Sequence, residues 1–232
     1  MVRYRSRRRR RWRAGTVLLL ILALTVLLVS CVAGSNSLWL LGLFGADLRV
    51  YEKEPVTAQL PTDGAIAAQL CAAVEFLNAG SVTMPEFRSA SQAVRLYRDA
   101  ILNSLIGSNY SAYVGNAALL ETVEQSYPHL TAAVLIPDSD FENAAAQYLG
   151  ASSVSNRDGQ LFSYLSKADC YMIPTQIGVR KIAVIPTGIA ETEHTYRMTF
   201  SLDDGEGGSA VYTALFLKRS EGIPYLRALT AV

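Results

Sequence analysis

The chain has 232 residues, half of them hydrophobic, with 21 basic and 20 acidic side chains. Eight arginines lie within the first 14 residues, so the remainder has 13 basic against 20 acidic side chains and a net charge of −7. Nucleic-acid binding requires a basic surface. An acidic remainder therefore argues against a nucleic-acid partner. The length allows one domain or two small ones.

A long uncharged segment follows the arginines. No charged side chain occurs between Ala14 and Ala46, and the densest apolar part is Thr16–Ala33. About 18–20 apolar residues are enough for a helix to cross a hydrocarbon core roughly 30 Å thick. In lipid, a helix is the only structure in which a single segment can form hydrogen bonds with all of its own backbone groups. We therefore predict a transmembrane anchor or signal segment over residues 15–45.

The position of the arginines predicts the topology. Residues 1–14 form a basic tail, which the positive-inside rule places in the cytoplasm. We therefore expect a cell-membrane protein that crosses the membrane once, with residues 62–232 as an extracytoplasmic domain. Residues 46–61, which contain Pro55 and Pro61, have no clean periodicity and indicate a linker.

Three outcomes remain open for the apolar segment. It stays as an uncleaved anchor, or it is a signal peptide cleaved near Ala33, where small residues gather. In the third outcome, Leu28-Val-Ser-Cys31 is the lipobox of a bacterial lipoprotein and Cys31 is lipidated. The apolar stretch Leu38–Phe44 is unusual so soon after a lipidated cysteine, so we favour the anchor. All three outcomes place the bulk of the chain outside the cytoplasm.

Cys71 and Cys170 are a candidate disulfide pair, because disulfides form outside the cytoplasm. Such a bridge would contribute roughly 4–5 kcal/mol in the chain-entropy model. The alternative is two separate buried thiols, since a free cysteine behaves as a small apolar residue. We favour the separate thiols. No CxxC pair occurs, which argues against a zinc ribbon or a thioredoxin-type site.

The first two elements of the domain are predicted to be helices. Thr62 or Asp63 caps the first, which ends at Gly80. Its apolar side chains recur at helical spacing, namely Ile66, Leu70, Val74 and Leu77. The sequence Thr83-Met-Pro-Glu86 has the form of a capping box with proline in the first turn. It predicts a second helix that continues to about Gly107.

The middle of the domain is also mainly helical. A third helix is predicted over Asn116–Tyr127, and Leu130–Ile136 is a short strand or an extended connection. A second capping box, Ser139–Glu142, begins another helix, which ends at Gly150. We expect a polar loop after it and a short helix over Leu161–Leu165.

From Cys170 onward the apolar period changes to two, which indicates strands. The candidate strands are Cys170–Ile173, Arg180–Ile185, Thr195–Leu202, Ala210–Lys218 and Tyr225–Thr230. A helical half followed by successive strands predicts an α+β domain, with helices on one face of an antiparallel sheet.

No motif points to catalysis or to a cofactor. The chain lacks G-x-S-x-G, G-x-G-x-x-G and P-loop sequences. Glu191-Thr-Glu-His194 has metal-binding residue types, but charged residues are also expected beside a strand. The acidic loop Asp203–Gly208 is too short for an EF-hand. We therefore name no catalytic, cofactor-binding or metal-binding residue. The 12 tyrosines suggest either a ligand-binding sheet or ordinary half-buried positions, and we favour the latter.

The layout over residues 63–232 resembles the nuclear transport factor 2-like (cystatin-like) superfamily. In that comparison Thr195–Leu202 and Ala210–Lys218 are similar to the central hairpin. The resemblance implies N-terminal helices against a curved antiparallel sheet of about four to five strands. The whole plan is also similar to membrane-anchored assembly components of bacterial secretion and conjugation systems. The resemblance transfers no site residue.

These observations favour a membrane-tethered extracytoplasmic module that binds or assembles with other components, without evident catalysis. The expected partners are the membrane and, as a further candidate, other proteins of the cell envelope. The alternative is a cell-envelope hydrolase whose active site has no recognisable motif.

Overall fold

A computed structural model describes residues 49–232 except 79, 132–133, 152–158 and 174–181. The chain divides into two compact units, Met1–Val50 and Tyr51–Val232. The predicted tail, the predicted anchor over residues 15–45 and Cys31 lie outside the described residues. None of the described helices combines the length and the apolar composition needed to cross a membrane.

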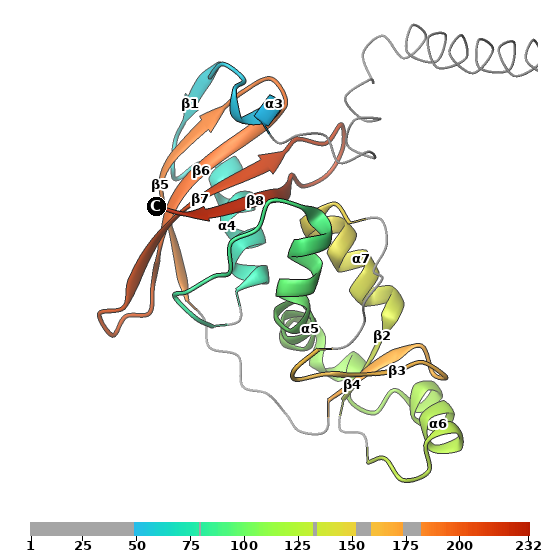
Figure 1. Ribbon diagram of the computed structural model, residues 1–232. Helices are drawn as coiled ribbons and strands as arrows, with labels where there is room; N and C mark the ends of the chain where they lie inside the picture. Colours follow the sequence, from blue (N-terminus) through green and yellow to red (C-terminus); the bar gives the residue numbers. More distant parts are fainter. Residues whose placement is uncertain (1–48, 79, 132–133, 152–158, 174–181) are drawn as a thin grey trace, which may run out of the picture. The chain divides into compact units, whose positions relative to one another are not determined.

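The second unit has the predicted α+β architecture (Figure 1). The helices are α3 (Arg49–Glu52), α4 (Ala65–Leu77), α5 (Ala90–Tyr113), α6 (Ala117–Ser126) and α7 (Asp138–Leu149). The strands are β1 (Ala58–Leu60), β2 (Val134–Pro137), β3 (Ser163–Leu165), β4 (Cys170–Ile173), β5 (Ala183–Glu191), β6 (Thr195–Asp203), β7 (Ser209–Leu217) and β8 (Tyr225–Ala231). They form a five-stranded sheet in the order β1-β5-β6-β7-β8 and a three-stranded sheet in the order β2-β4-β3. All strand pairs are antiparallel.

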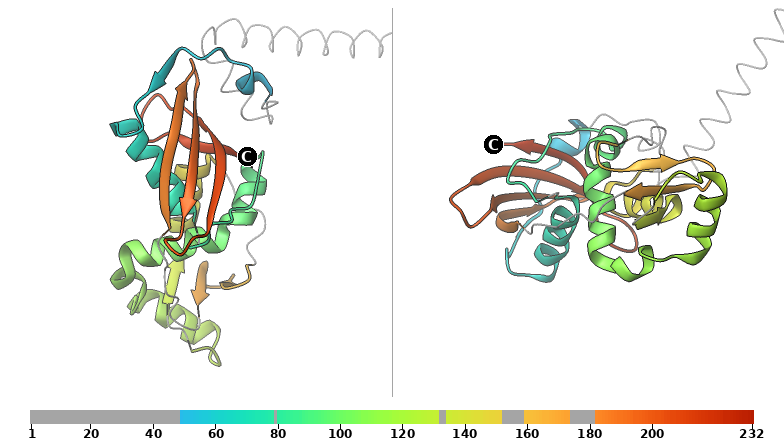
Figure 2. Two further views of the ribbon diagram at one scale, coloured as in Figure 1. Left: turned by 90° about the vertical axis from the view of Figure 1, so that its left-hand side faces the viewer. Right: turned by 90° about the horizontal axis from the view of Figure 1, so that it is seen from below.

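The main core lies between one face of the five-stranded sheet and helices α4, α5 and α7 (Figures 1 and 2). Its large buried side chains include Leu70, Leu77, Ile101, Phe141, Phe200 and Phe216. The stripe predicted for the first helix and the alternation predicted for Thr195–Leu202 both point into this core. Tyr97, Tyr171 and Tyr212 are also buried in it, so these tyrosines contribute to packing.

The three-stranded sheet packs against α6 through a separate cluster. Its buried members are Val123, Leu135, Leu165, Cys170 and Met172. The predicted helix over Leu161–Leu165 is wrong, because Ser163–Leu165 is strand β3, paired with β4. A five-residue helix has few internal hydrogen bonds to offset its nucleation cost. Pairing with β4 instead gives this backbone partners along its length.

The second predicted helix begins later than its capping box suggests. Helix α5 starts at Ala90, and the Ser89 hydroxyl accepts a hydrogen bond from the Gln92 amide at 3.3 Å. The predicted start at Thr83–Glu86 is wrong, because these residues are not helical and the Met84 amide donates to the Tyr212 hydroxyl of β7 at 2.8 Å. Directly after them, Phe87 exchanges both backbone hydrogen bonds with Leu229 of β8, at 3.1 and 3.0 Å.

Other element boundaries differ by smaller amounts. Helix α5 continues past Gly107 to Tyr113, with a non-helical residue at Asn109. Helix α4 is preceded by Gly64, which makes no side-chain cap, rather than by a capping Thr62 or Asp63. Helix α7 begins one residue before the predicted box, directly after Pro137.

Strand β5 extends well beyond the predicted end at Ile185. A β-bulge between Pro186 and Gly188 allows pairing with β6 to resume and continue to Glu191. Proline cannot donate to a neighbouring strand, and a bulge is where sheets accommodate it. The predicted strands at Cys170–Ile173, Thr195–Leu202, Ala210–Lys218 and Tyr225–Thr230 agree with the structure to within one residue.

Candidate functional site

The segment from Tyr51 to Leu60 is fastened to the five-stranded sheet, where the sequence indicates a linker. We call this segment the strap. Its C-terminal part is strand β1, which pairs with the end of β5. Just before β1, the backbone amide of Thr57 donates to the Glu191 carbonyl at 2.7 Å and the Thr57 hydroxyl donates to the same oxygen at 3.0 Å. The strap therefore adds an edge strand to the sheet.

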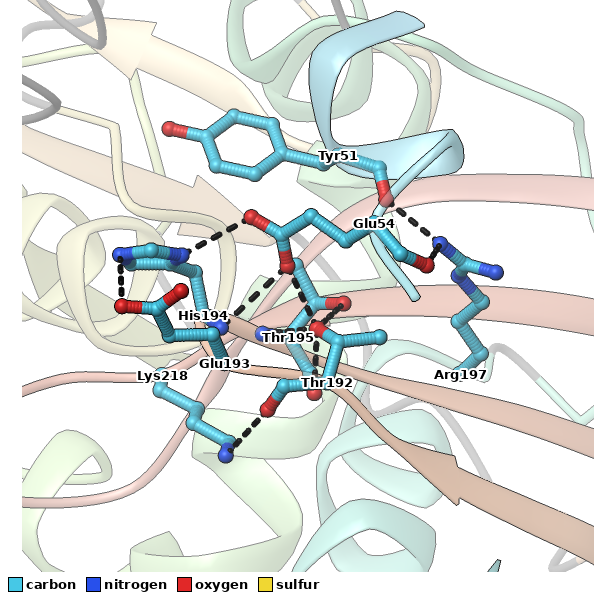
Figure 3. Close-up of polar contacts among 8 residues, drawn as sticks. All are labelled: Tyr51, Glu54, Thr192, Glu193, His194, Thr195, Arg197 and Lys218. Carbon is cyan, nitrogen blue, oxygen red and sulfur yellow. Dashed lines mark hydrogen bonds and ion pairs between the residues drawn. The ribbon is translucent and has the colours of Figure 1, made fainter. Parts of the chain in front are cut away.

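Arg197 on β6 holds the N-terminal part of the strap (Figure 3). Its Nη2 donates to the carbonyl of Tyr51 at 2.7 Å and to the carbonyl of Glu54 at 3.0 Å. Tyr51 is 5% exposed. A guanidinium presents its donors in a rigid plane, which suits it to bridging two fixed carbonyl oxygens. Arg197 therefore holds the strap through its backbone carbonyl groups and not through one of its side chains.

The carboxylate of Glu54 binds the turn between β5 and β6 through both of its oxygens. Oε2 accepts from the Thr192 hydroxyl at 2.6 Å and from the His194 amide at 3.3 Å. Oε1 lies 2.9 Å from Nδ1 of His194. An ionised carboxylate only accepts, so Nδ1 carries the proton in this contact.

The environment of Glu54 favours its ionised form. Burial of the side chain, which is 13% exposed, acts to raise the pKa of this carboxyl. The hydrogen bonds from the Thr192 hydroxyl and from the amide and ring of His194 outweigh burial and hold its pKa below the ordinary value. The contacts made by Glu54 therefore depend on its charge.

Two buried threonines shape the turn that Glu54 contacts. Thr192 and Thr195 are each 0% exposed. The Thr195 amide donates to the Thr192 hydroxyl oxygen at 2.9 Å, and the two hydroxyl oxygens lie 2.7 Å apart. The single proton of the Thr192 hydroxyl is directed to Glu54, so the Thr195 hydroxyl donates to Thr192. This chain of donors fixes both side chains and the turn between them.

Lys218, the residue directly after β7, bonds to the part of the cluster that lies on β5 and the following turn. Its ammonium donates to the Glu191 carboxylate at 2.6 Å and to the Thr192 carbonyl at 2.7 Å. It also lies 4.7 Å from the centre of the Tyr196 ring, within the range of a cation–π contact. The cluster therefore joins the strap to β5, β6 and β7.

A histidine, a carboxylate and a hydroxyl are the components of a hydrolytic triad, but their arrangement here differs. The Thr192 hydroxyl donates to Glu54 and not to the ring of His194. A nucleophile must be hydrogen-bonded to its base and must be reached by the substrate. Thr192 and Thr195 are both fully buried. These three groups therefore join the strap to the turn between β5 and β6.

The residues considered for metal binding are occupied by other contacts. Glu191 pairs with Lys218, and Nδ1 of His194 pairs with Glu54. Glu193 lies 3.8 Å from Nε2 of the same ring, and its side chain is 82% exposed. Across the described parts of the chain, no group of three or more histidine, cysteine or acidic residues is arranged to hold a metal ion.

Cys71 and Cys170 are free thiols in separate parts of the unit. Cys71 is half-buried on α4, against the main core, whereas Cys170 is buried on β4 beside α6. Burial, and secondarily the charge of Asp169, raises the pKa of Cys170 to about 11. Burial also raises the pKa of Cys71, with Glu75 adding to the effect. A thiol of raised pKa is a poor nucleophile.

The residues that build this site carry no local sequence signal. Glu54 lies 138 positions from Thr192 and 140 from His194, and Arg197 lies 143 positions from Glu54. No short motif links them, and in the sequence Glu191 and His194 stand out only as residue types that can bind a metal. No protein-family model, curated protein or solved structure matches the chain. The function is therefore argued from the site itself.

Proposed function

We propose that this chain is a membrane-tethered extracytoplasmic module for binding or assembly, with residues 15–45 as an uncleaved anchor. The uncharged segment and the arginines before it support the tether, because together they match a single crossing with a cytoplasmic N-terminus. The observation that carries the proposal is the fastening of the strap to the five-stranded sheet. Residues 51–60 of the segment for which the sequence indicates a linker are therefore part of the folded unit.

The fastening suits a module that carries load between a membrane and a partner. A pull on the chain before Tyr51 acts first on the contacts of Arg197 and Glu54, and then on the pairing of β1 with β5. These contacts spread the load over β5, β6 and β7. A flexible linker would leave the orientation of the domain undefined.

The arrangement of side chains favours binding over catalysis. The histidine, carboxylate and hydroxyl groups of the cluster bond to one another, and these bonds hold the strap on the sheet. Helices packed on one face of an antiparallel sheet, with β6 and β7 paired over nine positions, support the resemblance to nuclear transport factor 2-like domains. Fold-level likeness does not identify a ligand.

Fractionation of bacterial cells that express the full chain tests the proposal. We expect the chain to stay in the membrane pellet after an alkaline carbonate wash. Leu22→Arg should release it, because a charge at the centre of a membrane helix costs about 2.5–3.5 kcal/mol on insertion scales. Leu22→Ala is the matched control and should remain in the pellet.

Protease added to spheroplasts tests the orientation. Residues 62–232 should be digested while an epitope on the basic tail stays protected. Cys31→Ser separates the anchor from the lipoprotein, because only a lipoprotein is cleaved before Cys31, so only in that case does the change leave a longer mature chain. Protection of the domain together with digestion of the tail would contradict the topology.

A further inference from the structure

The strap is joined to the sheet at two places with an exposed stretch between them. Its N-terminal part is held by the contacts of Glu54 and Arg197, and its C-terminal part is β1, which pairs with β5 over three positions. Residues 55–57 between these two places are exposed. Segments with short pairing and little buried apolar surface open at a lower free energy than core strands. The geometry therefore allows the strap to open as a separate unit.

The groups that bind the carboxylate of Glu54 are arranged as donors. The His194 amide can only donate, and the oxygen of the Thr192 hydroxyl is already taken by the amide and the hydroxyl of Thr195, at 2.9 and 2.7 Å. A protonated Glu54 would place a further proton among these donors, unless both buried threonine hydroxyls reversed. Hydrogen bonds to an ionised acceptor are also roughly twice as strong as those to a neutral one. The contacts of Glu54 therefore require its ionised form.

Other titratable and charged groups surround Glu54 (Figure 3). They are Tyr51, Glu52 and Lys53 on the strap, Glu191 at the end of β5, Glu193 and His194 in the turn, Tyr196 and Arg197 on β6, and Lys218 after β7, while Tyr225 and Arg227 on β8 act on Tyr51. Lys218 pairs with Glu191, and Arg197 binds backbone carbonyl groups. A positive charge on His194 would strengthen its contact with an ionised Glu54. Release of the strap by acid therefore requires protonation of Glu54 itself.

We propose that protonation of Glu54 releases the strap from the sheet while β5, β6, β7 and β8 stay paired. The hydrogen bonds to Glu54 hold the pKa of its carboxyl below the ordinary glutamate value of about 4.3. The strap is therefore bound at neutral pH and opens only below about pH 4. The core strands do not depend on this carboxylate, because β6 pairs with β7 over nine positions above a buried apolar core.

Release of the strap would lengthen the connection between the anchor and the domain. Helix α4 begins at Ala65, directly after Gly64, so an open strap adds residues 51–64 to the linker. At most roughly 3.5 Å per residue, these residues add up to about 50 Å of reach. This consequence rests on the proposed function, because it requires the membrane anchor. The release of the strap itself does not depend on the anchor.

Amide hydrogen exchange of the full chain in detergent, measured from pH 6 to pH 3.5, tests the release. Each rate is divided by the intrinsic rate of an unstructured peptide at the same pH. Protection of residues 51–60 should fall at least ten-fold over this range, while β6 and β7 keep theirs. Glu54→Gln should lack the protection of the strap at both ends of the range. Glu52→Gln, the same substitution at an exposed position of the strap, should keep the natural pH dependence.

Three results would overturn the release. They are strap protection that stays constant to pH 3.5, a loss shared by β6 and β7, and a natural pH dependence in Glu54→Gln. If circular dichroism shows that Glu54→Gln is unfolded, Glu191→Gln decides, because the pH dependence should persist in that variant and its loss would overturn the assignment to Glu54. Flotation of the chain with phosphatidylcholine liposomes tests the tether separately. A chain that does not float contradicts the proposed function and leaves the exchange result in detergent unaffected.

Discussion

Glu54 and His194 lie 140 positions apart in the sequence, yet Oε1 of Glu54 is 2.9 Å from Nδ1 of His194. The contact joins the strap to the turn between β5 and β6 (Figure 3). The same carboxylate also accepts from the Thr192 hydroxyl and from the His194 amide. One side chain thus holds both the ring and the backbone of the turn.

Glu54→Ala is expected to lower the free energy of unfolding by about 1–3 kcal/mol, because it leaves the Thr192 hydroxyl buried without its acceptor. Urea unfolding followed by circular dichroism measures the change. Glu52→Ala, which removes an exposed glutamate two residues away, is the control and should change stability by less than about 0.5 kcal/mol. Equal effects of the two substitutions would show that the cluster does not stabilise the unit.

The contribution of Glu54 to stability should depend on pH. Its pKa is lowered in the folded state, so the carboxyl binds its proton less readily there than in the unfolded chain. The contribution is therefore fully present above the ordinary glutamate pKa of about 4.3 and is lost as the pH falls through the lower, folded value.

Comparison of the natural chain with Glu54→Gln isolates this effect. The difference in unfolding free energy between the two should be largest at pH 6 and should shrink as the pH falls below 4. Unfolding curves across that range measure it. A difference that stays constant from pH 6 to pH 3 would mean that the charge of Glu54 contributes nothing.

Arg197→Met should loosen the strap without unfolding the sheet. The substitution keeps an apolar stem but removes the donor to the Tyr51 and Glu54 carbonyls. We expect amide hydrogen exchange to rise at least ten-fold over residues 51–60, while β6 and β7 keep their protection. Exchange followed by mass spectrometry resolves the two regions. Arg95→Met, at an exposed position on α5, should leave the strap protected, and an unchanged strap in Arg197→Met would contradict the role of Arg197.

Gly150 and Gly205 allow a matched comparison of backbone strain with steric clash. Both have positive φ, +63° and +72°, where a side chain is disfavoured by about 1 kcal/mol. A Cβ at Gly150 would also meet the ring of Tyr225, whereas a Cβ at Gly205 meets nothing within 4 Å. Gly150→Ala should therefore destabilise the unit by at least 1 kcal/mol more than Gly205→Ala. Thermal and urea unfolding of the two variants, if indistinguishable, would show that the Tyr225 ring moves aside freely.

The sequence by itself determined the elements whose apolar side chains repeat at short range. The spacing of Leu70, Val74 and Leu77 marks α4, and the alternation through Thr195–Leu202 marks β6. Such a pattern indicates that one face of the element is buried. It can be recognised from neighbouring residues of the sequence alone. They were sufficient for the α+β class and for most of the strands.

Only the tertiary structure decided which distant segments meet. The Thr83–Glu86 box has the sequence of a helix start, but the next residue, Phe87, pairs with Leu229 of β8 and the helix begins only at Ala90. In the same way, Glu54 and Arg197 become parts of one cluster only when the strap lies on the sheet. Hydrogen bonds between residues about 140 positions apart produce no periodic pattern in the sequence. Each forms only when packing of the whole core brings two distant segments of the chain together.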